Sequence, residues 1–265
     1  MAPVATTRVA LTRGISPAIA DCELTHLTRT PIDLDAARRQ HAAYEATLAA
    51  LGCRVERLEA DPAAPDCVFV EDIALVFEEL AVITRPGAAS RRRETAPVAA
   101  ALARYRRHEH IAADGTQDGG DVLVAGRRVF VGVTARTDEA GAASLARALN
   151  PAGYTLSTLA VDGVLHLKSA ASVVAPGLLL IDPECVDPTA FADFDVVTVA
   201  PGEGPAANAL RLAGTVLLSA GFPATRRKLE ERGLAVRSVE NAELAKAEGG
   251  LTCCSLIFDV AESAR

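Results

Sequence analysis

The hydrophobic pattern of the chain contains a strand pair that recurs along the sequence. In each copy, one short apolar run is followed by a turn and then by a second apolar run. Turns this short between apolar runs are typical of β-hairpins. A further pair is predicted between a C-terminal run and an N-terminal run, and this pair would close the copies into a ring. The predicted pairs are 73–77 with 80–84, 121–124 with 129–133, 171–174 with 178–181, 209–212 with 215–218, and 251–258 with 9–11.

Helices are predicted between the strand pairs. The clearest runs from an N-cap at Asp33 to about Leu51, with an apolar face and with Gly52 as its end. Further helices are predicted over 90–105 and 137–149, beginning at Ser90 and Thr137, with shorter ones over 225–232 and 240–246. Five units of a strand pair and a helix predict an α/β propeller formed by a single domain of residues 1–265. An ordinary α/β sandwich with accidental similarity is the alternative.

The composition excludes several classes of protein. Half of the 265 residues are apolar and the formal net charge is −7, so the chain has no basic footprint for nucleic acid. No apolar stretch reaches the length of a membrane span, and residues 1–8 lack the layout of a signal peptide. We therefore expect a cytoplasmic protein. Its six cysteines are expected to be reduced thiols, and no zinc-site, Walker or GxGxxG spacing occurs.

Three carboxylates stand in an apolar segment, 66–77, whose pattern predicts a buried strand. Asp66, Glu71 and Asp72 have no basic residue near them within this segment. An ionised carboxylate is costly in a protein core unless a cation neutralises it. The segment therefore predicts a cation, supplied by another part of the fold or by a bound small molecule. The alternative is that the strand ends at Glu71-Asp72 and that both of these acids reach solvent.

Each strand pair also carries a polar group at or just before its first strand. In a ring these groups would face one end of the axis, which would bring a nucleophile, an acid–base group and cation-binding acids into one pocket. Taken singly, each has a structural explanation, since buried cysteines are usually inert and a histidine in an apolar strand is usually a hydrogen-bonded core residue. Recurrence at equivalent positions favours a functional site. The groups are Glu71 with Asp72, Asp118-Gly119-Gly120-Asp121, His166, Asn208 and Cys253.

Five motifs together resemble those of the dimethylarginine dimethylaminohydrolases, members of a guanidino-modifying enzyme superfamily that includes arginine deiminases and amidinotransferases. The motifs extend over nearly the whole chain, at 65–72, 83–88, 118–121, 165–169 and 251–255. The resemblance implies a five-bladed α/β propeller (a pentein), in agreement with the ring of strand pairs.

The resemblance also implies roles for the matched residues. Cys253 matches the nucleophile, His166 the general acid and base, and Asp118 the acid of a catalytic triad. Relatives often carry Asp where Glu248 stands, and the segment 15–18 departs from theirs, so the substrate preference stays open. The positions that match substrate-binding residues are Asp66, Glu71 and Asp72 around the guanidinium with Phe69 beside them, Arg91 and Arg136 at the amino-acid end, Leu24 on a lid loop, and Ala247 and Glu248 at the α-amino group.

The reaction implied by the resemblance is hydrolysis of N-omega-methylated arginines to citrulline and dimethylamine or methylamine, through a covalent thiouronium on the cysteine. It needs no metal or organic cofactor. Its partner is a small guanidino amino acid, not a nucleic acid or a membrane, and a homodimer is compatible with the sequence. Three alternatives remain open: an arginine deiminase acting on free arginine, a hydrolase of another modified guanidine, and a guanidine-binding protein without catalysis.

Overall fold

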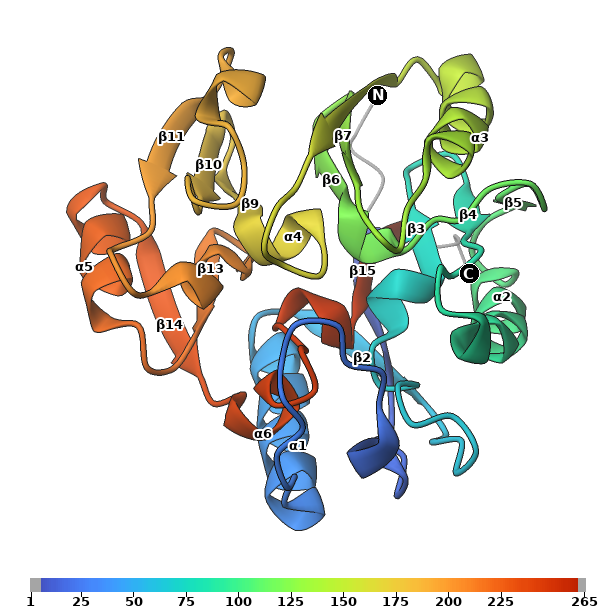
Figure 1. Ribbon diagram of the computed structural model, residues 1–265, viewed down its shortest axis with the longest axis horizontal. Helices are drawn as coiled ribbons and strands as arrows, with labels where there is room; N and C mark the ends of the chain where they lie inside the picture. The colour runs from blue at the N-terminus through green and yellow to red at the C-terminus, as the bar shows by residue number, and fades with distance from the viewer. Residues whose placement is uncertain (1–5, 262–265) are drawn as a thin grey trace.

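A computed structural model describes residues 6–261, in which five three-stranded sheets surround a common axis (Figure 1). The prediction about a signal peptide rests on residues 1–8, of which 1–5 lie outside the described residues, as do 262–265. Within the described part of the chain, no helix is long and apolar enough to cross a membrane.

Every sheet has the same topology. Its first strand pairs antiparallel with the second, and the second pairs parallel with the third. All five predicted strand pairs are confirmed, including the closing pair, in which Leu11 lies opposite Leu256. The third strand of each sheet was not predicted. The sheets are β3 (Ala74–Val76), β4 (Ala81–Ile83), β5 (His108–His110); β6 (Val122–Ala125), β7 (Arg128–Val133), β8 (Thr155–Ala160); β9 (Ala171–Ala175), β10 (Leu178–Ile181), β11 (Asp195–Thr198); β12 (Ala209–Leu212), β13 (Thr215–Ser219), β14 (Ala235–Val239); and β15 (Leu256–Ala261), β1 (Thr6–Arg13), β2 (Cys53–Leu58).

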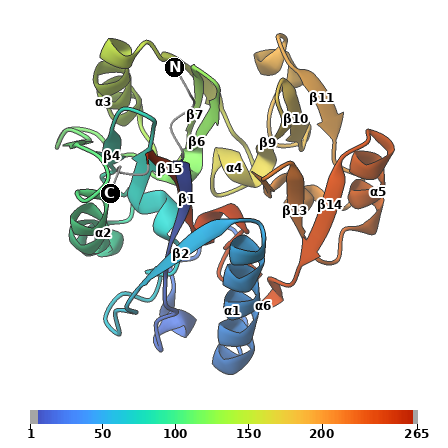
Figure 2. The ribbon, with the colours of Figure 1, turned by 180° about the vertical axis from the view of Figure 1, so that it is seen from behind.

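A helical segment joins the second and third strands of each sheet and lies on the outside of the ring (Figures 1 and 2). The third sheet uses only a short 3₁₀ helix for this connection. The apolar core is divided into clusters that fill the spaces between neighbouring sheets and these outer helices. The connecting segments are α1 (Leu34–Ala50), α2 (Thr95–Leu102), α3 (Glu139–Leu149), η6 (Pro188–Phe191) and α5 (Pro223–Glu231).

The first predicted helix is confirmed at both ends. The Asp33 carboxylate accepts a hydrogen bond from the Ala36 N–H at 2.9 Å, which satisfies one of the unpaired donors of the first turn. Tyr44 and Leu48 of the predicted apolar face are buried. Gly52 has a φ of 92°, a left-handed conformation that glycine adopts without a steric penalty.

Two predicted helix starts are wrong. Ser90 does not cap a helix, because the predicted helix 90–105 begins as the 3₁₀ helix η3 (Ala89–Glu94) and becomes α-helical only in α2. The Ser90 hydroxyl instead donates to Glu23 at 2.5 Å. The cap of α3 is Asp138 rather than Thr137, because the Asp138 carboxylate accepts from the Gly141 N–H at 2.7 Å. The remaining short helices are η1 (Ile19–Asp21), η5 (Asn150–Ala152) and α6 (Ala242–Ala245).

A single helical turn precedes the first strand of every sheet, and sequence reasoning missed this element. The prediction that 66–77 forms one strand is therefore wrong, since only Ala74–Val76 is extended. In a 3₁₀ turn, residues three apart lie on the same side. Val70 and Ile73 accordingly enter the core while Glu71 and Asp72 face other directions. The five turns are η2 (Val70–Ile73), η4 (Gly119–Asp121), α4 (Leu167–Ala170), η7 (Gly204–Ala207) and η8 (Thr252–Cys254).

Candidate active site

Four of the five helical turns bring polar side chains to one small pocket. Cys253 lies in η8, His166 caps α4, and Asp72 lies in η2. All three line the pocket, and Asp118, which caps η4, lies behind the His166 ring. The fifth turn contributes Asn208 at its end, but this side chain does not line the pocket. Its side-chain amide forms hydrogen bonds with Thr252 and with the Lys168 carbonyl, and so connects neighbouring sheets.

His166 is held between two carboxylates. Its Nε2 lies 3.1 Å from Asp118 Oδ2, and its Nδ1 lies 3.7 Å from Asp72 Oδ1. Asp118 is fully buried, and its other carboxylate oxygen accepts the Gly87 N–H at 2.9 Å. Because Asp118 is fixed by the backbone in this way, it fixes the orientation of the imidazole.

The same carboxylates set the charge of His166. Burial disfavours the imidazolium, but the negative charges of Asp72, Asp121 and Asp118 outweigh it and raise the pKa of His166 from 6.5 to about 9. Asp121 does not reach the ring by a hydrogen bond. It accepts the Leu167 N–H at 3.0 Å and the Thr134 hydroxyl at 2.8 Å. At neutral pH His166 is therefore a proton donor.

Cys253 has a neutral thiol in the protein without ligand. Burial, and then the charges of Glu71 and Asp72, raise the pKa of Cys253 well above 9. The Gly250 N–H, which donates to Sγ at 3.3 Å, lowers the pKa of Cys253 but does not outweigh these effects. A cation bound in the pocket would offset the surrounding carboxylates and favour the thiolate, which is the nucleophilic form.

The two neighbouring cysteines, Cys253 and Cys254, face different surroundings. Both belong to the core cluster that contains Tyr44, but only Cys253 lines the pocket. Cys254 donates its thiol hydrogen to the Gly250 carbonyl at 3.6 Å. The reason is the helical turn of η8 and not the alternation of a strand. No disulfide joins any of the six cysteines, all of which lie within residues 6–261.

The three acids that first indicated a cation are buried, which excludes the alternative that Glu71 and Asp72 reach solvent. Asp72 is neutralised by Arg91, whose Nη1 donates to Oδ2 at 2.6 Å. Glu71 is neutralised by Lys168 at 2.6 Å. Asp66 accepts only the Glu23 N–H, at 3.2 Å, and within residues 6–261 no Lys, Arg or His nitrogen lies within 4.0 Å of its carboxylate. Asp66 is thus the acid without a directly paired cation, although the charges of Arg91 and Arg136 act on it from further away.

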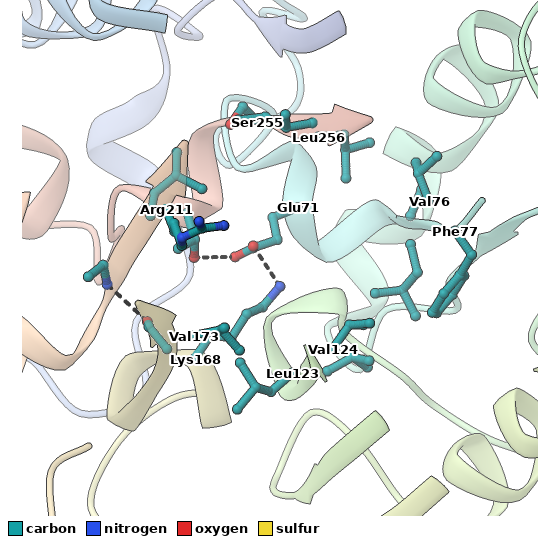
Figure 3. Close-up of a pocket in the computed structure, with 18 residues that line it drawn as sticks. Glu71, Val76, Phe77, Leu123, Val124, Lys168, Val173, Arg211, Ser255 and Leu256 are labelled. Atoms are coloured by element: carbon teal, nitrogen blue, oxygen red, sulfur yellow. Dashed lines mark hydrogen bonds and ion pairs between the residues drawn. The ribbon is translucent and has the colours of Figure 1, made fainter. Parts of the chain in front are cut away.

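Glu71 does not line this pocket and faces instead a cavity on the axis of the ring (Figure 3). This axial cavity of about 350 Å³ is lined by the first strands of all five sheets, and its lining includes Lys168 and Thr252 but neither Cys253 nor His166. Lys168 and the Thr252 hydroxyl each donate to a different Glu71 oxygen at 2.6 Å. The predicted guanidinium acid Glu71 is therefore placed with its carboxylate on the axial side.

The two predicted carboxylate-binding arginines have protein partners. Arg91 also donates to Glu94 at 2.9 Å and to the Phe69 carbonyl at 2.9 Å. Arg136 donates to the Thr25 hydroxyl at 3.2 Å and lies 3.8 Å from Asp118. Both side chains line the pocket with Cys253, as do Asp66, Phe69 and Ala247.

Glu248 holds the segment 25–27, which lies just after the pocket residue Glu23 in the chain. The Glu248 carboxylate accepts the backbone N–H groups of Thr25 at 3.1 Å, His26 at 2.6 Å and Leu27 at 2.6 Å. Its φ of 58° is unusual for a residue with a side chain. Leu24, predicted on the lid, is partly buried against the core cluster of Cys253 and does not line the pocket itself.

Sequence reasoning missed three residues that line the pocket, namely Glu23, Leu165 and Gly249. A β-carbon on Gly249 would lie 2.2 Å from the Phe69 ring, so only glycine fits beside this side chain. The pair Gly249-Gly250 just before the cysteine motif was the available signal, because paired glycines indicate close backbone approach.

One cluster among the described residues has the spacing of a metal site. The ligand atoms of Asp72, Asp118 and His166 lie within 4.8 Å of one another. Each of these groups already has a partner in the protein, Arg91 for Asp72 and the Gly87 N–H for Asp118, with His166 between them. The contacts are those of a proton-transfer group held by carboxylates.

Comparisons with known proteins agree with this geometry. No family model matches the chain. An N(G),N(G)-dimethylarginine dimethylaminohydrolase of Streptomyces coelicolor is 40% identical over 251 residues, covering 93% of this chain and 95% of the relative. The enzyme of the same name from Pseudomonas aeruginosa is 36% identical over 228 residues, covering 85% and 90%.

Solved structures show the same similarity. A Cys-to-Ser variant of the Pseudomonas aeruginosa enzyme, complexed with citrulline, superposes with a TM-score of 0.90 at 33% identity and covers 94% of this chain and 98% of its own. The N-terminal domain of ArgZ, an arginine dihydrolase from cyanobacteria, has a TM-score of 0.83 at 19% identity, covering 94% and 97%, and shares the fold. The predicted five-bladed α/β propeller is confirmed.

Proposed function

Because this chain belongs to the dimethylarginine dimethylaminohydrolase family, we propose that it hydrolyses methylated arginines to citrulline and an alkylamine. The observation that carries the proposal is the pocket itself, in which a cysteine and a protonated histidine lie among buried carboxylates. A guanidinium supplies the paired cation that Asp66 lacks, and its carbon is the electrophile that the thiol needs.

Asp66 and Asp72 hold the guanidinium. The role of Asp66 is supported by its place in the pocket lining without a paired cation. The role of Asp72 is supported by the Gly120 N–H, which donates to Oδ1 at 3.0 Å and so fixes the carboxylate. Phe69 lies beside them, and Glu71 adds negative charge from the axial side. Held in one orientation, the guanidinium carbon faces the sulfur, which lowers the entropic part of the barrier.

The covalent step follows from the charges of Cys253 and His166. The bound cation lowers the pKa of the thiol, and the thiolate Sγ forms a bond to the guanidinium carbon. The bond from this carbon to the methylated nitrogen breaks, and the leaving amine takes a proton from His166. His166, now neutral, removes one proton from water, whose oxygen adds to the carbon. The C–S bond then breaks, and the second proton of the water passes to the released thiolate. Citrulline leaves, and Asp118 keeps the imidazole in position throughout.

The remaining predicted residues hold the amino-acid end of the substrate. Arg91 and Arg136 place positive charge for the α-carboxylate, and the Ala247 carbonyl and Glu248 receive the α-ammonium. Because Glu248 also binds three backbone N–H groups of the segment with Leu24, substrate binding and closure of this segment share one carboxylate.

The test is a citrulline assay with arginine, monomethylarginine and both dimethylarginines. We expect turnover of monomethylarginine and asymmetric dimethylarginine. Turnover of arginine alone would assign an arginine deiminase instead, and binding without turnover would assign a guanidine-binding protein. Cys253→Ser is expected to lower citrulline formation by at least about 10³-fold, because the nucleophile is lost. Cys254→Ser is the matched control and is expected to retain most activity; equal losses in both variants would contradict the assignment.

The setting of the enzyme is proposed on the same basis. We propose that residues 1–265 form one domain that acts in the cytoplasm on a small guanidino amino acid, without nucleic acid, membrane or cofactor, and that it forms a homodimer. Sedimentation of the purified chain measures the oligomeric state directly, and fractionation of cells that express it measures its location. A monomer, or a chain found outside the cytoplasm, would contradict these two points and leave the reaction unaffected.

A further inference from the structure

A second cavity lies beside the candidate active-site pocket, where the third, fourth and fifth sheets meet. Its volume is about 380 Å³, within the range of about 300–1,000 Å³ found for small-molecule pockets. It shares Leu165, Glu248 and Gly249 with the active-site pocket, and the rest of its wall comes from other residues. None of the proposed steps of the reaction uses these other residues.

Most of this wall is apolar. Val164, Pro205, Ala220 and Phe222 contribute aliphatic and aromatic surface. Leu27 at its edge has 49% of its surface exposed and is one of two large apolar side chains exposed in the described part of the chain. Such a wall favours a ligand with an apolar body, because burying apolar surface on both sides is favourable.

The polar side chains of the wall include two carboxylates. Glu248 is bound by three backbone N–H groups, whereas Asp182, which is only 7% exposed, has fewer partners. Its Oδ1 accepts a hydrogen bond from the Glu184 N–H at 3.1 Å, and its Oδ2 accepts a weak one from the Cys185 thiol at 3.7 Å. No ion pair of Asp182 with Lys, Arg or His exists in residues 6–261, and no Lys or Arg lines the cavity. A buried carboxylate without a cation is costly, so this carboxylate favours a cationic ligand.

Gly204 keeps the carboxylate open to the cavity. A β-carbon at this position would lie 2.6 Å from Asp182 Oδ2, and both residues line the cavity. Any side chain at 204 would therefore displace or cover the carboxylate. The φ of Gly204 is not in the left-handed region, so the close approach is what requires glycine here.

We propose that this cavity binds a small organic cation, with its ammonium group on Asp182 and its apolar body against Val164 and Phe222. An ammonium donates a charge-assisted hydrogen bond to Oδ2, which has only a weak thiol partner. The occupant is a molecule separate from the substrate of the active site. The inference stands on the cavity and its charge and does not depend on the reaction proposed above.

The test is titration of the full-length protein with 2-phenylethylammonium, followed by calorimetry. Saturable binding is expected, and the neutral analogue 2-phenylethanol is expected to bind at least about 10-fold more weakly, because it cannot neutralise the carboxylate. Asp182→Asn keeps the acceptor for the Glu184 N–H and removes the charge, and it is expected to weaken binding at least 10-fold. Asp162→Asn, which removes the charge of an exposed neighbour, is the matched control and leaves binding unchanged.

Two further variants separate this cavity from the active site. Asp66→Asn removes the unpaired acid of the active-site pocket and is expected to leave probe binding unchanged. Ala220→Leu fills the second cavity and is expected to abolish binding, whereas Ala224→Leu at an exposed position does not. The proposal is overturned if the probe does not bind, if Asp182→Asn and Ala220→Leu bind it as well as the unchanged protein, or if only Asp66→Asn loses it.

Discussion

The axial cavity and the candidate active-site pocket are built from the same helical turns, yet they differ in charge. Glu71 and Thr252 line the axial cavity, and the residues that directly follow them, Asp72 and Cys253, line the pocket. A single turn of η2 or η8 thus sends consecutive side chains to two regions. The turns separate the catalytic groups from the axis without any additional layer of structure.

The protein itself neutralises the acid of the axial region, but it pairs only one of the two acids Asp66 and Asp72 in the pocket with a cation. Both Glu71 oxygens have a donor at 2.6 Å, from Lys168 and Thr252 (Figure 3). On the pocket side, Asp66 has only a backbone donor, and the charges around Cys253 keep its thiol neutral. The sequence indicated a cation for three acids. The fold supplies one to Glu71 and one to Asp72, and it leaves Asp66 to be paired by a ligand.

The largest expected effect is on the pocket side, with Asp118→Asn. This positioning residue orients His166, and its carboxylate helps to raise the pKa of the imidazole. Its loss is therefore expected to lower kcat by about 10²- to 10⁴-fold, the usual contribution of general acid–base catalysis. The pKa of His166, measured by NMR, is expected to fall as well. A kcat within threefold of the unchanged protein, or an unchanged His166 titration, would contradict this role.

On the axial side, Lys168→Met is expected to affect stability. It leaves Glu71 buried without a cation, which costs about 3–5 kcal/mol of unfolding free energy. Denaturant unfolding of the single variant and of the double variant Glu71→Gln with Lys168→Met is the measurement, and the double variant is expected to recover most of the loss. Equal losses in the two proteins would show that the ion pair is not the cause.

The pair Asp66→Asn and Glu71→Gln compares the two regions directly. Asp66→Asn is expected to raise KM by about 10- to 100-fold, because charge-assisted hydrogen bonds contribute about 1.5–3 kcal/mol. Glu71→Gln is expected to change KM less and stability more, since its carboxylate is bound to Lys168. Equal increases in KM would mean that both acids contact the guanidinium and would remove the distinction drawn between the regions.

The smallest expected effect is a shift in pH dependence with Asp121→Asn. Its charge helps to raise the pKa of His166 to about 9, so the alkaline limit of kcat is expected to move to lower pH, by about one unit or 1.4 kcal/mol. The raised pKa stabilises the folded protein fully below pH 6.5, and this contribution is lost as the pH rises through 9. A pH–rate profile and thermal melting from pH 6 to 10 measure both, and an alkaline limit that stays in place would exclude the role of Asp121.

Sequence patterns predicted the hairpins and α1 because both depend on local periodicity. A strand pair with a short turn is recognisable within about a dozen residues, and the Asp33 cap acts on an N–H only three residues away. The third strands escaped prediction for the opposite reason. Their pairing partners are the middle strands, which are reached only through a crossover helix, and short exposed strands such as β5 and β14 carry little apolar pattern of their own.

The sequence by itself indicated which residues to propose for the chemistry: Cys253, His166, Asp118 and the acids of 66–72 were singled out from recurrence and from the resemblance of the motifs. The tertiary structure decided their pairing. Whether an acid meets Lys168, Arg91 or no cation depends on side chains from distant turns, and a 3₁₀ turn instead of a strand decides which of two consecutive residues enters the pocket. Local periodicity is encoded along the chain, whereas the neutralisation of a buried charge depends on distances through space.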